Sequence, residues 1–178
     1  MDAAAPERPR AVTVIGWTWL VLALIRAGNG LLGWFVWRFG GLDRGIPFLP
    51  VEAMRAVRGF GLEWTLRHGL LIFGVQFVVA TSVAFIAWSL LQTKPWARPA
   101  LIAVACLGIL ATLAVSGFIA AATIVVAREA SGTEAAQARL AGFAAAAVIV
   151  LVGLILFGGT IYVLRRADVR AAFEKPAA

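Results

Sequence analysis

The chain has 178 residues, of which 62% are hydrophobic and 14% charged, and its formal net charge is +7. Ordinary soluble domains are close to half apolar and a quarter charged. A soluble chain of this length would also leave about a third of its unfolded surface facing water. The composition therefore excludes a soluble globular domain and a disordered chain, and it indicates a polytopic membrane protein.

Four apolar stretches are long enough to be membrane-spanning helices. They run from about Ala11 to Trp37, from about Trp64 to Leu91, from about Pro99 to Ala127 and from about Ala138 to Leu164. A helix needs about 20 residues to cross the hydrocarbon core, and each stretch exceeds that length. Because lipid cannot satisfy free backbone groups, and because the stretches do not alternate as barrel strands do, helices are expected. We predict an all-α fold, a bundle of four transmembrane helices in a single domain from residue 1 to residue 178.

The start of the first stretch has some features of a signal peptide. Arg8 and Arg10 precede an apolar run, as in the basic region of such a peptide. The run continues to Trp37, however, without a small-x-small cleavage site after a short apolar region. We therefore predict that the first stretch is a retained span.

The first stretch contains one charged residue, Arg26, near its middle. Asn29, Gly30 and Gly33 follow at spacings that put them on the same helical face. No Asp or Glu lies in any of the four stretches, and Gln76 near the middle of the second is the best intramembrane neighbour. We expect a candidate polar cluster of Arg26, Asn29 and Gln76, because a cation in hydrocarbon needs hydrogen-bonding partners.

Two interpretations of Arg26 remain open. In the first, Arg26 contacts an anion or a substrate, or forms a polar seam with a partner. In the second, its side chain extends toward the interface marked by Trp34 and Trp37, or ties the helix to its neighbours. Gly30 and Gly33 would then let another helix approach closely.

The longest segment outside the four stretches runs from residue 38 to residue 63. Glycines and prolines make its first half irregular. Its second half, from Val51 to Phe60, has the pattern of a short amphipathic helix on the membrane surface. A lid that binds a partner is the alternative.

Small residues recur at spacings that suit close helix packing. The predicted packing positions are Gly30, Gly33, Gly108, Thr112, Ser116 and Gly153. Ser116 precedes Gly117, but a serine nucleophile needs a base within reach. The sole histidine, His68, lies near the start of the second stretch. We predict no catalytic residues.

The sequence also predicts no metal site and no bound cofactor. One cysteine excludes a metal site made of several cysteines, and one histidine excludes a site of several histidines within one chain. The spans also lack the acidic residues that proton-coupled transporters usually carry there.

The charges at the ends of the stretches predict the orientation. With four spans, both termini share one side of the membrane. On that side, Lys94 and Arg98 lie in a very short loop, and Arg165 and Arg166 directly follow the fourth stretch. The positive-inside rule then predicts cytoplasmic termini in an inner membrane. Basic residues at the span ends favour contact with anionic headgroups and not with nucleic acid, and the basic tail would lie on anionic lipid or dock a cytoplasmic partner.

Two short sequences follow the second and the fourth stretch and look like a family pattern. Trp96-Ala97-Arg98 follows the second, and Leu164 to Phe173 follows the fourth. With the lengths of the stretches, they resemble uncharacterised small four-helix bacterial inner-membrane proteins. This resemblance implies a membrane fold, and it implies no activity and no site.

The function expected from these features is that of a non-enzymatic structural or accessory subunit. It would pack in a membrane complex or in a homo-oligomer, through the small-residue faces of its helices. The alternative is a small transporter or channel with a polar path near Arg26, Asn29 and Gln76.

Overall fold

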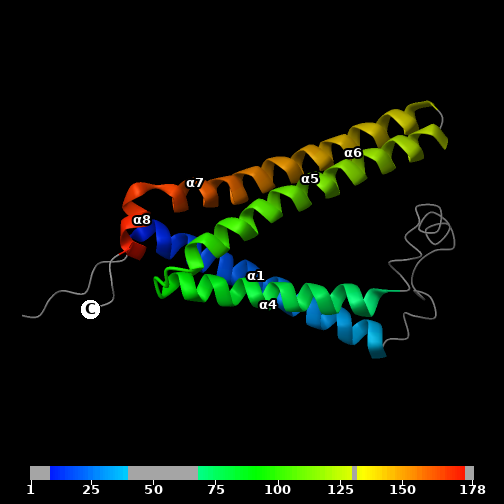
Figure 1. Ribbon diagram of the computed structural model, residues 1–178. Coiled ribbons are helices and arrows are strands. Elements are labelled where there is room, and N and C mark those ends of the chain that lie inside the picture. The colour runs from blue at the N-terminus through cyan, green and yellow to red at the C-terminus, as the bar shows by residue number, and fades with distance from the viewer. Residues whose placement is uncertain (1–8, 40–67, 130–131, 175–178) are drawn as a thin grey trace, which may run out of the picture. The chain divides into compact units, whose positions relative to one another are not determined.

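The computed structural model describes residues 9–39, 68–129 and 132–174, which are helical apart from short turns (Figure 1). Four helices in these ranges are long and apolar enough to cross a membrane: Arg10–Phe39, Gly69–Leu91, Ala97–Ile124 and Arg139–Arg165. The predicted all-α fold with four candidate spans is thus confirmed. The segment from 38 to 63, with its predicted amphipathic helix, lies outside the described residues except for positions 38 and 39. The predicted start of the second span, at 64–67, also lies outside them.

The first three spans are the helices α1 (Arg10–Phe39), α4 (Gly69–Leu91) and α5 (Ala97–Glu129). The fourth is composite: α6 (Gly132–Gly153) continues through one π-helical turn, η2 (Leu154–Gly158), into α7 (Gly159–Arg165). A short final helix, α8 (Ala167–Glu174), follows a break at Arg166. Pro9 directly precedes α1, and Pro99 lies in the first turn of α5, where a missing N–H leaves no helical bond unmade.

The helices form two compact units. The α1–α4 unit comprises Gly16–Ser89. The α5–α8 unit comprises the chain from Leu90 onward together with the first residues of the protein, up to Ile15.

Within the α1–α4 unit, glycine permits close contact between the two helices. A Cβ atom at Gly30 would lie 2.9 Å from the backbone nitrogen of Phe77 and 3.2 Å from the carbonyl oxygen of Phe73. At Gly33, the phenyl ring of Phe73 occupies the place of a side chain. Helices in lipid gain little from the hydrophobic effect, so close packing of this kind holds them together.

In the α5–α8 unit, α5 and α6 lie side by side (Figure 1). The ring of Phe157 fills the space over Gly108, and the side chain of Thr112 packs on Gly153. The Thr112 hydroxyl donates to the Gly108 carbonyl oxygen at 2.8 Å. Its polar atom is therefore satisfied within its own helix, and its methyl group is left for the contact with α6.

The deepest core of the α5–α8 unit lies where α7 passes into α8. Leu101 of α5, Leu164 of α7 and Val169 of α8 are fully buried, and Phe173 of α8 is nearly so. The apolar face of α8 therefore packs on the protein's own chain, and it is not left free to enter lipid.

Candidate functional site

Arg26 lies in the middle of α1. It follows Arg10 by sixteen residues and precedes Phe39 by thirteen, or about 24 and 20 Å at 1.5 Å per residue. The hydrocarbon core of a bilayer is about 30 Å thick. If α1 spans the bilayer, the backbone of Arg26 is inside the hydrocarbon region.

The side chains of Arg26 and Asn29 are both exposed. Among the residues that the structure describes, none forms a hydrogen bond or an ion pair with the Arg26 guanidinium or with the Asn29 amide. The flanking residues Leu22 and Ile25 are also exposed. This stretch of α1 thus presents a cation and an amide within an apolar surface.

Gln76, the third member of the predicted cluster, lies half-buried on α4. Its Nε2 atom donates to the backbone carbonyl oxygen of Arg26 at 3.4 Å, which is longer than the usual distance of about 2.9–3.0 Å. The structure therefore brings Gln76 to the level of Arg26, but to its main chain. The guanidinium and the Asn29 amide lie outside this contact.

The candidate spans in the described part of the chain offer Arg26 no counter-ion. None of the four candidate spans contains Asp or Glu. The described part of the α1–α4 unit, residues 16–39 and 68–89, contains no carboxylate side chain at all.

The four glycines named as packing positions lie where a neighbouring helix approaches closely. Gly30 and Gly33 face α4, and Gly108 and Gly153 lie at the contacts between α5 and the fourth span. Ser116 of α5 is 6% exposed, and its Oγ atom has no hydrogen-bond partner within the described part of the chain.

A second arginine, which the sequence places in a short loop between two spans, makes a defined contact. Arg98, near the start of α5, donates through Nε to the carbonyl oxygen of Leu164 at 2.8 Å. Leu164 lies in the last turn of α7, where carbonyl oxygens lack partners within the helix. The sequence itself shows only a cation near the start of a helix. It does not indicate the partner of that cation, because Leu164 lies 66 residues further along the chain.

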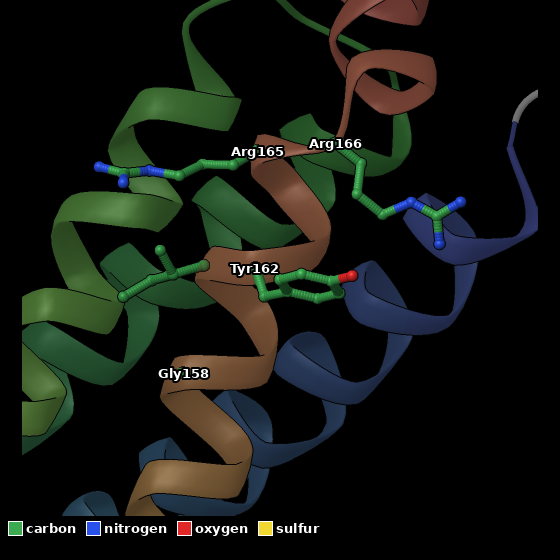
Figure 2. A pocket seen from close by; sticks show the side chains of 5 residues that line it. Gly158, Tyr162, Arg165 and Arg166 are labelled. Carbon is green, nitrogen blue, oxygen red and sulfur yellow. The ribbon is translucent and has the colours of Figure 1, made fainter.

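A shallow cavity of about 400 Å³ lies along α7, lined by Gly158, Ile161, Tyr162, Arg165 and Arg166. Arg165 and Arg166 leave the helix in opposite directions, and the Tyr162 hydroxyl lies on the side of Arg166 (Figure 2). Arg166 also forms an exposed ion pair, with Nε 3.2 Å from Oδ1 of Asp168. A phenol and two guanidinium groups at the end of a span are typical of the headgroup level of a membrane.

In the described ranges, no group of three or more His, Cys, Asp or Glu side chains is placed to hold a metal ion. Comparison of the chain with protein-family models, with curated proteins and with solved structures finds no match. What the sequence and the structure together show is a small polytopic membrane protein with four candidate spans.

Proposed function

We propose that the protein is a non-enzymatic structural or accessory subunit, which packs against other proteins in a membrane complex. The observation that supports this role is the polar pair of Arg26 and Asn29 in the middle of α1, which α4 leaves exposed within the α1–α4 unit. A charged residue at the bilayer centre costs about 2.5–3.5 kcal/mol on insertion scales. Since α4 covers α1 at Gly30 but leaves Arg26 exposed, a further protein surface over this face would remove that cost.

The alternative is a small transporter or channel. Arg26 and Asn29 share one face of α1, and Gln76 reaches the same level from α4. The three residues could line a polar path for an anion, because a guanidinium and two amides supply hydrogen-bond donors in a region that otherwise has few.

We further propose that the protein resides in a bacterial inner membrane, with both termini in the cytoplasm and with its basic end on anionic headgroups. The end of the α5–α8 unit where α7 meets α8 is strongly basic. It carries Lys94, Arg98, Arg165, Arg166 and Arg170, against two acidic residues of α8, Asp168 and Glu174. Positive charge next to a span favours the cytoplasmic side and attracts anionic lipids.

Site-specific photo-crosslinking in intact membranes tests the subunit role. A photoreactive amino acid at Asn29 is expected to give a protein adduct of fixed mass, because the face around Arg26 is covered. The same group at Leu110, an exposed residue of α5, is the comparison for lipid-facing positions. Lipid adducts alone at Asn29 would contradict the proposal. Anion flux through vesicles containing only the purified protein, lost in Arg26→Gln, would favour the transporter instead.

A further inference from the structure

The face of α1 around Arg26 also indicates the chemistry of its partner. We propose that it docks a transmembrane helix of a different protein that carries an ionised Asp or Glu near the bilayer centre. This inference rests on the proposed role as a membrane subunit, and it adds the identity of the group that Arg26 meets.

A carboxylate is the group that best satisfies the arginine. The guanidinium stays charged in proteins and has five N–H donors, which suit the two oxygens of a carboxylate. A carboxylate on a partner helix is itself costly in hydrocarbon, so pairing offsets the cost on both sides. Asn29, one turn further along α1, adds an amide that can hydrogen-bond the same helix. The exposed side chains of Leu22 and Ile25 supply apolar contact beside the charged pair.

The candidate spans of a second copy of this chain cannot supply the carboxylate. None of the four candidate spans contains Asp or Glu. Two copies joined symmetrically through this face would bring two Arg26 side chains to the same level, and like charges in a medium of low dielectric constant repel strongly. The partner is therefore a different protein.

Extension of Arg26 to the interface is disfavoured by the direction of its side chain. Side chains on a helix tilt toward its N-terminus. The nearer end of α1 is its C-terminus, about 20 Å away along the axis. The Cα–Cβ bond of Arg26 therefore points away from the nearer end of α1 and toward the more distant one.

The test uses synthetic helices of defined composition. The full chain is reconstituted in phosphatidylcholine vesicles, which carry no net charge, together with a labelled transmembrane Leu/Ala helix. This helix has Glu, Gln or Leu at its central position, and association is measured by energy transfer. We expect the Glu helix to bind at least about tenfold more tightly than the Gln helix. The preference should be lost in Arg26→Gln and partly kept in Arg26→Lys. Arg139→Gln, which removes an exposed charge at the beginning of the fourth candidate span, is the matched control and should keep the full preference.

Equal binding of the three helices, or a preference for Glu that survives Arg26→Gln, would overturn the inference. The crosslinking experiment separates this failure from that of the proposed function. One outcome is that Asn29 crosslinks to a protein of fixed mass while the chain binds the Glu helix no more tightly than the Gln helix. That result would support the subunit role and refute the carboxylate partner. If Asn29 meets only lipid, both fall.

Discussion

Arg98 of α5 donates a hydrogen bond from Nε to the carbonyl oxygen of Leu164, 2.8 Å away in the last turn of α7. This contact joins the start of the third span to the end of the fourth. It satisfies one of the carbonyl oxygens that a helix end leaves without a partner, and it places a positive charge at the negative end of the helix dipole. Arg98 is partly buried and Leu164 is fully buried, so water competes only weakly for the bond.

Replacement of Arg98 by Leu should lower the free energy of unfolding by about 1.5–3 kcal/mol, as expected for a hydrogen bond with a charged donor. Unfolding of the purified protein in mixed micelles, followed by circular dichroism, measures the change. Arg165→Leu is the control, because Arg165 is exposed and should change the stability by less than about 0.5 kcal/mol. Equal effects of the two substitutions would show that the Leu164 contact contributes nothing.

Replacement of Gly30 by Ala should separate α1 from α4. The added Cβ atom would lie 2.9 Å from the backbone nitrogen of Phe77, and a backbone atom cannot rotate away as a side chain can. We expect a loss of about 1–3 kcal/mol, the usual effect of overpacking. Gly28→Ala is the matched control, because a Cβ atom there meets nothing within 4 Å and alanine favours the helix. The two variants should therefore change the stability in opposite directions, which the same unfolding assay detects.

The spans could be predicted from the sequence because the hydrocarbon thickness fixes their length and charges mark their ends. The third span, predicted from Pro99 to Ala127, is α5, Ala97–Glu129. The same patterns cannot reveal contacts between distant side chains. Gln76 was expected near Arg26 because both lie deep in their spans, and it does reach α1. The sequence could not show that its amide meets the backbone of Arg26, because this depends on how α1 and α4 are rotated about their axes.

The Arg98–Leu164 contact shows the same limit. It depends on the relative positions of α5 and α7, which local residue patterns do not determine. Val169 and Phe173 lie four residues apart, a spacing that is typical of an amphipathic helix. The spacing does not show whether the apolar face meets lipid, a partner or the chain itself. The structure shows both side chains buried within the α5–α8 unit.

Replacement of Phe173 by Ala should therefore destabilise the fold and not merely loosen a membrane contact. The ring is 7% exposed, and removal of a buried phenyl group costs about 3–5 kcal/mol in a well-packed core. Ala171→Ser, on the exposed face of α8, should stay within about 0.5 kcal/mol of the parent. Unfolding in micelles distinguishes the two variants. A Phe173→Ala protein of unchanged stability would show that α8 does not stabilise the unit.

The charges at the α7–α8 junction should hold the C-terminus in the cytoplasm. Arg165 and Arg166 extend from the end of the fourth span in opposite directions, so both can reach headgroups around the helix (Figure 2). A reporter fused after Ala178 should give a cytoplasmic signal, and a reporter inserted at Gly132 should give the opposite one.

Replacing Lys94, Arg165 and Arg166 together by Gln should increase the fraction of inverted chains, because it removes positive charge from the cytoplasmic side of the membrane. The same number of replacements at Arg38, Arg128 and Arg139, on the other side, should not invert the protein. A cytoplasmic signal from Gly132 in the parent chain would refute this orientation.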